Sequence, residues 1–586
     1  MRIVARLVVA ASLIATTGVA HAAPPTVASV YPARQRIDAG RHTIIEVHFD
    51  QDIAAESVTS TTFRVFGRWS GPATGSFTVA ASTITFTPSD PFFAGEWITV
   101  QLSKGIQNTS GENMLQGYAW NFWIETANGN LTLSYDGRVN VRQGGETWVQ
   151  VYGAYAGDLN NDGWSDLTVP CEQTDDARVL LSNNGTFSAT GMSVETLTDG
   201  NIPSPNEGAD FDNDGEIDMV IGNTGNNKAS IVFGDGTGNF VNARKTSVTC
   251  GSTIRGVGVG DFNGDGWDDF VTANRFGNNL SIVLNNGDGT FAAAVAKEAG
   301  ANDEYTIAIA DANNDGLQDI FCGTFASPYY MIVLLGNGNG GFTAQPPVLQ
   351  GGRPWQSVCG DFNKDGNVDV ASCNSDNNKV GVLFGNGSGG FLAAVTTFTC
   401  DTFPLAIDAG DIDGDGDLEI VTSNYTGGNW NIFQNTNGVF GNKKVLSSSS
   451  AGSCVVLHDR DNDGDLDLTG LDEIDDWLYF YENVGTATGV TPSVAVVNML
   501  QNQPNPFNPT TSIRFELTRD ANVSLTVYDA AGAFVARLAN ARYSRGDHEV
   551  RWDATDSRGS RVGSGVYFYR LSADGQTLTR KMVLLK

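Results

Sequence analysis

Seven short acidic segments share one pattern of oxygen-bearing residues that could hold a hard metal ion. Each reads Asp-x-Asp/Asn-x-Asp-Gly-x-x-Asp/Glu, and they begin at Asp158, Asp210, Asp261, Asp311, Asp361, Asp411 and Asp459. Carboxylates crowded this closely repel one another unless a cation lies between them. Calcium takes about 6–8 oxygen ligands, whereas zinc prefers nitrogen or sulfur and Mg²⁺ prefers a smaller octahedral site. Calcium is therefore the expected ion.

The expected metal ligands are the side chains at positions 1, 3, 5 and 9 of each segment. A backbone carbonyl at position 7 is expected to add another oxygen, and the glycine at position 6 permits a sharp turn. An EF-hand loop closes with Glu at position 12 and lies between helices, so this pattern differs from it. The candidate metal residues are Asp158, Asn160, Asp162, Asp166, Asp210, Asp212, Asp214, Asp218, Asp261, Asn263, Asp265, Asp269, Asp311, Asn313, Asp315, Asp319, Asp361, Asn363, Asp365, Asp369, Asp411, Asp413, Asp415, Glu419, Asp459, Asp461, Asp463 and Asp467.

The segments recur at a steady period, with successive starts 52, 51, 50, 50, 50 and 48 residues apart. Short apolar or alternating runs precede and follow each one, as at 254–260 and 270–274, between Gly- and Asn-rich turns. About four short strands per repeat of this length predict the blades of a β-propeller. The last repeat stops near residue 485 without a trailing strand, and residues near 130–145 begin like that missing piece. We therefore predict seven blades, the last completed by residues 130–145.

The charge of the repeats supports cation binding. Residues 150–485 contain 13 Lys/Arg against 47 Asp/Glu, a net charge of -34, and 24 of these acids are motif side chains. Seven Ca²⁺ ions would relieve the repulsion where it is greatest. The net charge of -31 for the whole chain excludes a nucleic-acid partner, because phosphates would be repelled.

The repeats resemble the FG-GAP (VCBS) repeats of the integrin-α-type propeller over residues 130–485. This resemblance implies up to seven structural calcium ions in hairpin loops. It also implies that these ions lie on the face opposite the one that usually meets ligands.

Two flanking modules have the alternating patterns of β-sandwiches. Residues 24–126 resemble the SbsA-type bacterial Ig-like domain, which usually serves as a spacer. After a linker at 486–498, residues 499–586 resemble the FlgD/Vpr Ig-like module and the C-terminal sorting domains of type IX-secreted proteins. The segments that carry this second match are 504–509, 552–553, 565–567 and the end "KMVLLK". It implies outer-membrane secretion machinery as a partner. The predicted fold class is all-β, a seven-bladed β-propeller flanked by two Ig-like β-sandwiches.

The N-terminus predicts export. Arg2 and Arg6 precede an apolar run that ends in Ala20-His21-Ala22, the pattern of a secretory signal peptide at residues 1–22. No later run has the roughly 18 apolar residues of a transmembrane helix, so we expect a protein secreted or held at a bacterial cell surface. The seven cysteines are expected to be buried thiols, although Cys359 and Cys373 flank one acidic segment and could be cross-strand neighbours.

A candidate ligand face follows from aligning the repeats. The residues six positions before each first Asp should rim the central channel on the face away from the metals; they are Tyr152, Ser204, Arg255, Tyr305, Trp355, Leu405 and Ser453. Loops between the second and third strands add Arg275, Phe276, Phe325, Tyr329, Tyr425 and Trp430. The ligand-face candidates are Arg255, Tyr305, Trp355, Arg275, Tyr425 and Trp430. Aromatic side chains with an Arg fit sugar stacking or protein hot spots, and aromatics at blade ends also serve as core.

No catalytic constellation stands out. His458 is the single histidine of the repeats, and it is expected to pack beside a metal loop. A Ser-His-Asp arrangement, a phosphate loop and a CxxC motif are all without support. We predict a non-enzymatic, calcium-binding protein of recognition or adhesion, with an extracellular protein or glycan as ligand. Two alternatives remain open: a secreted polysaccharide lyase or hydrolase on a propeller scaffold, and a structural surface-layer component.

Overall fold

The computed structural model describes residues 23–238, 240, 244–392, 395–484, 497–499, 502, 504–517, 521–529, 534–544, 546–573 and 576–585. The chain divides into two compact units, Met1–Thr486 and Ala487–Lys586. The predicted signal peptide and most of the predicted linker lie outside the described residues. Apart from the short 3-10 helix η1 (Ala55–Ser57), the regular structure of the described residues is β-strand, so the all-β fold class is confirmed. No helix in the described part of the chain is long and apolar enough to cross a membrane.

The N-terminal sandwich consists of two four-stranded antiparallel sheets. One contains, in spatial order, β1 (Val27–Tyr31), β2 (Ile45–Phe49), β6 (Thr83–Pro88) and β5 (Gly75–Ala80). The other contains β4 (Gly71–Pro72), β3 (Phe63–Gly67), β7 (Trp97–Leu102) and β8 (Tyr118–Trp123). In β2 the side chains of Ile45, Val47 and Phe49 are buried while the two residues between them are less so, which is the period of two expected of a half-buried strand.

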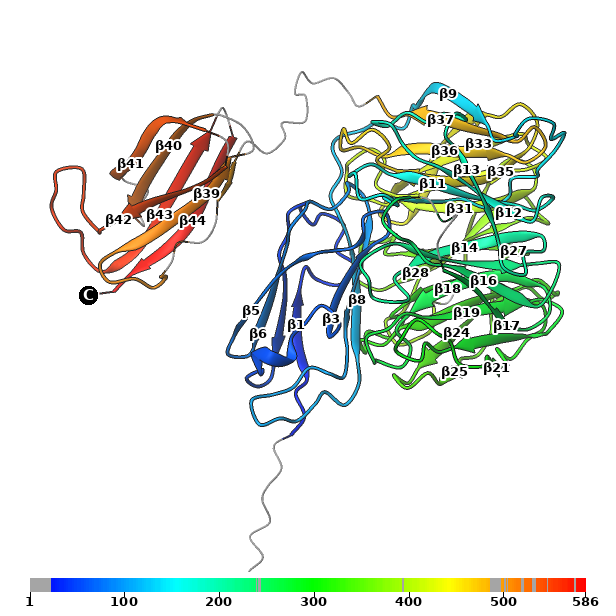
Figure 1. The fold of residues 1–586 in the computed structure, drawn as a ribbon, viewed down its shortest axis with the longest axis horizontal. Coiled ribbons are helices and arrows are strands. Elements are labelled where there is room, and N and C mark those ends of the chain that lie inside the picture. The colour runs from blue at the N-terminus through cyan, green and yellow to red at the C-terminus, as the bar shows by residue number, and fades with distance from the viewer. Residues whose placement is uncertain are drawn as a thin grey trace, which may run out of the picture. The chain divides into compact units, whose positions relative to one another are not determined.

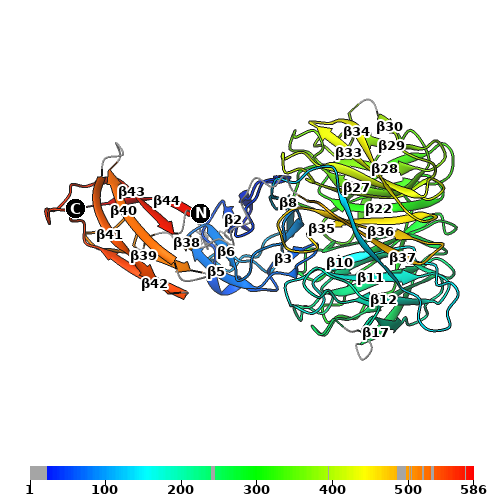
Figure 2. The same cartoon turned by 90° about the horizontal axis from the view of Figure 1, so that it is seen from above.

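Seven further sheets of the first unit form the propeller (Figures 1 and 2). The first three contain β10 (Tyr155–Gly157), β11 (Asp166–Cys171), β12 (Asp176–Leu180) and β13 (Ser193–Thr196); β14 (Pro203–Ala209), β15 (Asp218–Asn223), β16 (Lys228–Val232) and β17 (Lys245–Thr249); and β18 (Ile254–Gly260), β19 (Asp269–Asn274), β20 (Asn279–Val283) and β21 (Val295–Lys297).

The next three contain β22 (Glu304–Ala310), β23 (Asp319–Thr324), β24 (Tyr330–Gly336), β25 (Phe342–Ala344) and the short β26 (Val348–Leu349); β27 (Pro354–Gly360), β28 (Asp369–Asn374), β29 (Lys379–Leu383) and β30 (Thr396–Thr399); and β31 (Pro404–Gly410), β32 (Glu419–Asn424), β33 (Asn429–Thr436) and β34 (Val439–Ser447).

The seventh sheet closes the ring. It contains β35 (Gly452–His458), β36 (Asp467–Asp472), β37 (Trp477–Glu482) and, as its outer strand, β9 (Ser134–Asn140). The strand expected within residues 130–145 is therefore β9, which pairs with β37 although more than 300 residues separate them. The first strand of each sheet contacts the first strand of the next, and β35 contacts β10.

Each sheet has an inner edge, a buried middle and an exposed outer edge. The second strand is buried along its whole length in all seven sheets, because neighbouring sheets pack on both of its faces. The inner strands approach closely, so that a Cβ at Gly256 would lie 2.7 Å from the carbonyl oxygen of Tyr305. The glycines of "IRGVGVG" therefore fit the crowded centre of the ring.

All seven cysteines are free thiols, and six of them are buried. The considered pairing of Cys359 with Cys373 is wrong. Cys359 lies opposite Val370, whereas Cys373 lies opposite Val380 on the following strand. The two thiols lie on the paired strands β27 and β28 but are three residues out of register, and they belong to different core clusters.

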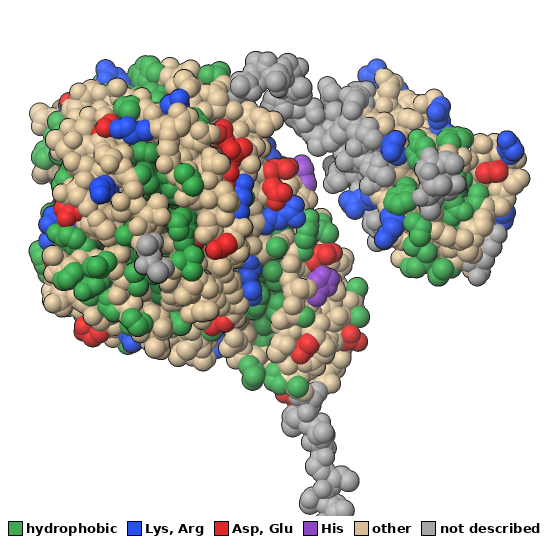
Figure 3. All heavy atoms as spheres, turned by 180° about the vertical axis from the view of Figure 1, so that it is seen from behind, with side chains coloured by type: hydrophobic (Ala, Val, Ile, Leu, Met, Phe, Trp, Pro, Cys, Tyr) green, Lys and Arg blue, Asp and Glu red, His purple; other side chains and the backbone are tan. Residues whose placement is uncertain are grey.

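The N-terminal sandwich packs on the propeller through the sheet of β3, β7 and β8 (Figures 1 and 2). The backbone amides of Lys104, Ala119 and Ala127 donate to the carbonyl oxygens of Gly264, Gly316 and Gly464, at 2.8, 2.6 and 2.6 Å. Arg64 adds a buried ion pair with Asp268. Figure 3 shows acidic and basic side chains along this border. The sandwich is thus docked on the propeller.

The second unit is a separate sandwich. One of its sheets contains β38 (Val497–Met499), β39 (Thr511–Leu517) and β42 (Gly546–Trp552), and the other contains β41 (Phe534–Tyr543), β40 (Ala521–Asp529), β43 (Gly565–Ala573) and β44 (Gln576–Leu584). Phe515, Leu525, Trp552 and Tyr569 lie in its core. On the face drawn in Figure 3 its charged side chains are mostly Lys and Arg.

Candidate functional site

Each of the seven acidic segments forms a tight loop between the first and second strands of a sheet. Positions 4 and 6 have a left-handed backbone in every loop, for example Gly264 (φ 72°) and Gly266 (φ 91°). Only glycine and, at greater cost, residues such as Asn adopt this conformation readily. Position 4 is accordingly Asn or Gly in six loops, with Lys364 the exception, and position 6 is always Gly.

The last acid of every segment, and the first acid of the first six, fix the loop by accepting backbone hydrogen bonds. In the seventh loop both carboxylate oxygens of Asp459 are buried and have no hydrogen-bond partner among the described residues. In the third loop the Oδ1 of Asp261 accepts from the amides of Gly264 and Asp265, and its Oδ2 accepts from Gly266 at 2.8 Å. Asp269 accepts from the amides of Phe262 and Asn285 at 3.0 and 2.8 Å. In all seven loops the acid at position 9 accepts from the backbone amide of the residue at position 2 and from a backbone amide at the end of the third strand or just after it. The cage is therefore held in place by the protein's own backbone.

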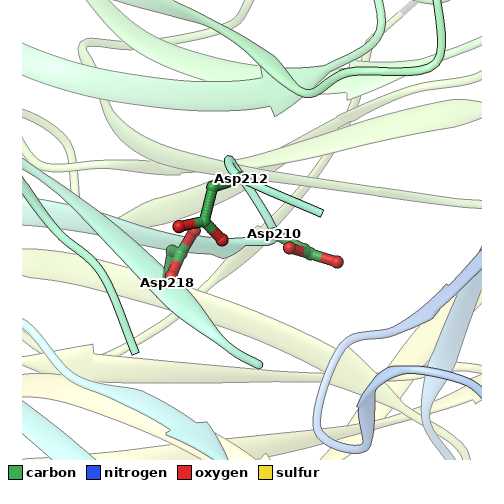
Figure 4. Close-up of side chains that lie close together, drawn as sticks. All are labelled: Asp210, Asp212 and Asp218. Atoms are coloured by element: carbon green, nitrogen blue, oxygen red, sulfur yellow. The ribbon is translucent and has the colours of Figure 1, made fainter. Parts of the chain in front are cut away.

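Three loops bring carboxylates together closely enough to share one cation. The groups are Asp210, Asp212 and Asp218; Asp411, Asp413 and Glu419; and, in the seventh loop, Asp459, Asp461 and Asp463, with oxygens in each group within 4.8 Å of one another. Figure 4 shows the first group, in which the carboxylates of Asp212 and Asp218 point toward each other. The Oδ1 atoms of Asp212 and Asp413 are buried and have no hydrogen-bond partner among the described residues.

The other four loops have Asn at position 3. There the amide of Asn160, Asn263, Asn313 or Asn363 donates to the Oδ2 of the acid at position 5, at 2.9–3.2 Å. At positions 1, 3, 5 and 9 these loops hold three acids each, where the second, sixth and seventh loops hold four. The structure thus brings the predicted residues of every loop into one turn, with a closer gathering of carboxylates where position 3 is Asp.

Burial raises the pKa of these acids strongly. The pKa of Asp319 and of Asp369 is raised to about 8, and that of Glu419 to about 9, mainly because the carboxyl groups are removed from water. Neighbouring loop acids raise them further. Such groups are stable as carboxylates only next to positive charge.

The seventh loop contains residues that the motif did not predict. Glu482 joins Asp461 and Asp467 in a second carboxylate group. Arg460, at position 2, contacts Glu482 and lies 3.8 Å from Asp467, so this loop carries a cation of its own. The repeats offered a signal, because Glu482 stands where the other six have Leu, Phe or Gln, and Arg460 stands where they have apolar residues.

The loops fit calcium by the chemistry of their donors. Carboxylate and amide oxygens converge on a turn, and orphaned buried oxygens of Asp212 and Asp413 lack any other partner. The residues that would hold each ion are those at positions 1, 3, 5 and 9. His458 is not among them; it is fully buried, and its Nδ1 and Nε2 lie 2.9 Å from the hydroxyls of Ser165 and Thr469. Burial lowers its pKa to about 3, so it packs as a neutral ring.

The opposite end of the channel gathers the residues predicted to rim it. All seven residues that precede the loops by six positions line one cavity of about 130 Å³: Tyr152, Ser204, Arg255, Tyr305, Trp355, Leu405 and Ser453. Arg68 and Trp69 of the N-terminal sandwich close the cavity from the side of the metal loops. The Nε1 of Trp355 donates to the hydroxyl of Tyr152 at 2.7 Å and links two distant sheets across the opening. This end of the channel is called the channel mouth below.

An aromatic stack lies beside the channel mouth. The rings of Tyr305 and Phe325 are stacked with centroids 4.4 Å apart, and Trp355 meets both rings edge-on at 5.3 and 5.4 Å. The guanidinium of Arg275 lies 4.2 Å from the centre of Phe325. Tyr305 is only 1% exposed, so it supports Trp355 and Phe325 from below and does not present its own face.

The prediction of Trp430 as a ligand-face residue is wrong. Trp430 is fully buried in β33, where its Nε1 donates to the carbonyl oxygen of Cys454 at 2.8 Å. Its ring fills the space above Gly470, where a Cβ would lie 2.3 Å from the indole. Tyr425, by contrast, is partly exposed, and its ring contacts Phe403 next to Trp355.

Two acids near the channel mouth, the half-buried Glu172 and the buried Glu473, were missed in the sequence. The Nε2 of Gln150 donates to Glu172 at 3.0 Å and to Glu473 at 2.9 Å, so one amide joins both carboxyl groups. Burial raises the pKa of each to about 7. Neither acid belongs to a repeated motif. Only their place after the second strands of their sheets could have pointed to them.

Comparisons with known proteins agree with this architecture. A bacterial Ig-like domain matches residues 21–123, and a FlgD Ig-like domain matches residues 502–577. FG-GAP-like repeats match residues 158–221, 210–272, 261–322, 311–372 and 361–422. The chain has no significant match among curated proteins.

Similar solved structures include a functionally unknown protein from Desulfotomaculum acetoxidans DSM 771. It is 14% identical, with a TM-score of 0.33, over 56% of this chain and 98% of that one.

Proposed function

We propose that this chain, with FG-GAP-like repeats between two Ig-like domains, is an exported recognition or adhesion protein that binds an extracellular protein or glycan at the channel mouth. One observation carries the proposal. Seven residues at one repeat position, including Tyr152, Arg255 and Trp355, meet at a single cavity at the end of the channel that the N-terminal sandwich leaves uncovered. Cavities with a few convergent polar groups and aromatic walls are typical ligand sites.

In this proposal calcium is a structural ion. Positions 1, 3, 5 and 9 of each loop would hold up to seven ions, whose positive charge would offset buried carboxylates such as Glu419. The first strand of each sheet runs from the channel mouth to a metal loop, so seven residues or roughly 20 Å separate the two ends. The ions therefore act on ligand binding only by holding the ring together.

The site contents favour binding over catalysis. The single histidine of the repeats is sealed between Ser165 and Thr469, and the matched families are repeat and Ig-like modules without an enzyme family among them. A polysaccharide lyase or hydrolase on this scaffold would need an acid and a base at the channel mouth. The two acids beside it, Glu172 and Glu473, are joined by the single amide of Gln150. A surface-layer component would need no ligand at all.

Export is part of the proposal. Residues 1–22 would act as the signal peptide and residues 499–586 as a sorting module that engages outer-membrane secretion machinery. We propose the domain limits 24–126, 130–485 and 499–586, with a linker at 486–498. A secretion assay of the chain with and without 499–586 would test this assignment, since loss of surface or medium localisation is expected only for the shortened chain.

The binding proposal is tested by exposing the calcium-loaded protein to arrays of glycans and of bacterial and host surface proteins. Trp355→Ala should abolish binding to the ligand found, whereas Val439→Ala, an exposed residue of the outer strand β34, should leave it unchanged. Release of sugar fragments would favour the enzyme. Absence of binding to either array, with normal melting, would favour the surface-layer component and contradict the proposal.

A further inference from the structure

We infer that the channel mouth binds a sugar that carries a single anionic group, and that Arg255, Arg275 and Arg353 hold this group. The inference rests on the proposed function and names the ligand class for the same site. These three residues, called the arginine triad below, are three of only 13 Lys/Arg among residues 150–485.

The arginine triad converges on the stacked rings of Tyr305 and Phe325. The guanidinium carbons of Arg255 and Arg275 lie 5.9 and 5.8 Å from the centre of Tyr305. Those of Arg275 and Arg353 lie 4.2 and 4.7 Å from the centre of Phe325. One aromatic pair thus orients three cations toward the same region, two from the third sheet and one from the residue before the fifth.

These cations lack the partners that other basic residues of the ring have. Arg178 and Arg460 form close ion pairs with two or more acids each. Arg255 forms no hydrogen bond or ion pair with any residue that the structure describes. The guanidinium of Arg275 has only Asp303, at 3.9 Å, and that of Arg353 donates only to the hydroxyl of Tyr329, at 3.2 Å, among the described residues.

The Nε atoms of all three arginines are buried and have no hydrogen-bond partner among the described residues. Glu172 is the acid whose charge acts on Arg255, yet it lies beyond ion-pair distance. In a ring with a net charge of -34, three cations without close acids are unexpected. A buried donor without an acceptor destabilises the fold, so an anion supplied by a ligand would remove this cost. The planar fork of Arg suits carboxylate best, because it can donate two parallel hydrogen bonds.

Aromatic faces beside the arginine triad fit the apolar C–H face of a sugar ring. Phe276 is 64% exposed and lies 4.9 Å from the guanidinium of Arg275. Trp355 is held in place by Tyr152 on one side and by Phe403, at 5.5 Å, on the other. Pre-oriented rings of this kind bind without loss of side-chain entropy.

Size and overall charge limit the ligand further. Arg255, the member of the triad that lines the cavity together with Tyr305 and Trp355, faces a space of about 130 Å³, which admits one ring or a short side chain and not a long polymer segment. The net charge of -34 over residues 150–485 repels polyanions. A neutral glycan that ends in one acidic sugar satisfies both conditions, because only its terminal charge must approach the arginine triad.

The test uses two sugars that differ in one group. Methyl β-D-glucuronide and methyl β-D-glucoside are titrated into the full calcium-loaded protein and followed by calorimetry, and galactose 6-sulfate distinguishes sulfate from carboxylate. We expect the glucuronide to bind at least tenfold more tightly than the glucoside. Arg255→Gln and Arg275→Gln should each weaken glucuronide binding by tenfold or more. Lys297→Gln, which removes a positive charge from the outer strand β21, should change nothing.

Each outcome decides the inference. Arg255→Lys keeps the charge but loses the fork, so an intermediate loss with unchanged melting would support bidentate recognition. Equal binding of the two methyl glycosides would overturn the inference and leave the proposed function standing. Binding of an acidic peptide in place of both anionic sugars would overturn it in the same way. Absence of binding to every sugar and peptide, together with empty glycan and protein arrays, would overturn both proposals.

Discussion

Arg64 of the N-terminal sandwich and Asp268 of the third metal loop form a two-pronged ion pair, with Nη1–Oδ1 and Nη2–Oδ2 distances of 2.9 Å each. Both side chains are buried, at 7% and 6% exposure, and 204 residues separate them. Arg64 also donates to the carbonyl oxygen of Asp210 in the second loop. One side chain therefore ties the sandwich to two metal loops.

Arg64→Met should destabilise the first unit by about 3–5 kcal/mol, because it leaves the carboxylate of Asp268 buried without its partner. The double variant Arg64→Met with Asp268→Asn should recover part of this loss. Arg36→Ala breaks an exposed pair with Asp38 and should cost about 0–1 kcal/mol. Urea denaturation followed by tryptophan fluorescence measures all three. A loss below about 1 kcal/mol for Arg64→Met would contradict the docked arrangement.

Substitutions at two equivalent loop glycines distinguish the effect of backbone strain in the turn from the effect of the docked sandwich. Gly266 and Gly366 both occupy position 6 with left-handed φ values of 91° and 85°. A Cβ at Gly266 would lie 2.3 Å from the carbonyl oxygen of Thr61 in the sandwich, whereas a Cβ at Gly366 would meet nothing within 4 Å. Either change to Ala should cost about 1–2 kcal/mol through the backbone.

Only Gly266→Ala should also loosen the sandwich. Hydrogen exchange is expected to rise in β3, β7 and β8 for Gly266→Ala and to stay unchanged there for Gly366→Ala. Equal rates of hydrogen exchange in these strands for both variants would show that the sandwich does not depend on the third loop.

Position 3 of the metal loops should set calcium affinity. Asp212 supplies a carboxylate with an orphaned oxygen, whereas Asn263 supplies an amide that donates to Asp265. Asn263→Asp adds one charged ligand and should raise the affinity of the third loop by roughly an order of magnitude. Asp212→Asn should lower that of the second loop to a similar extent.

Competition titrations with a calcium chelator measure both changes. Thermal melting in excess chelator should fall well below that of the calcium-loaded protein, because an ion bound only by the folded state stabilises it. Equal affinities for the wild type and both variants would show that position 3 does not contact the ion.

The loops and the channel mouth were predictable because both depend on local chemistry repeated at a fixed period. Position 6 is glycine in all seven loops since each needs a left-handed turn, and Tyr152, Arg255 and Trp355 share one register on the inner strands. Alignment of the repeats was therefore enough to bring them to one place.

Features that depend on contacts between distant residues could not be predicted from the sequence. Trp430 was expected on the surface, but it is buried because Gly470, on the neighbouring sheet, leaves room for its indole. No local pattern links these two residues. The contact of Arg64 with Asp268 depends in the same way on how two domains pack. The alternation of apolar and polar residues within the strands of the sandwich cannot predict it.

Glu473 offers a pH-dependent test of the acids beside the channel mouth. It is 5% exposed, its Oε1 accepts from Gln150 at 2.9 Å, and its Oε2 has no partner among the described residues. Burial is the main cause that raises its pKa to about 7; Glu172, Asp472 and Asp476 are the acids that add to this effect. In the unfolded chain the pKa of Glu is about 4.3.

Because the folded pKa is the higher of the two, the folded protein keeps this proton between about pH 4.3 and 7 while the unfolded chain loses it. The contribution of Glu473 to stability is therefore present below about pH 4 and is lost as the pH rises through 7. Glu473→Gln keeps a neutral side chain at every pH. It should stabilise the propeller by roughly 2–3 kcal/mol at pH 8 and by much less at pH 5.

Urea denaturation of both proteins at pH 5 and 8 measures this difference, and comparison at equal pH cancels the titration of the metal loops. Glu298→Gln, at an exposed position after β21, is the matched control and should change stability at neither pH. A variant that is less stable than the wild type at pH 8 would mean that the charge of Glu473 is compensated in the folded protein. The unpartnered Oε2 would then have a cation beside it, and the acids at the channel mouth would themselves form a binding site.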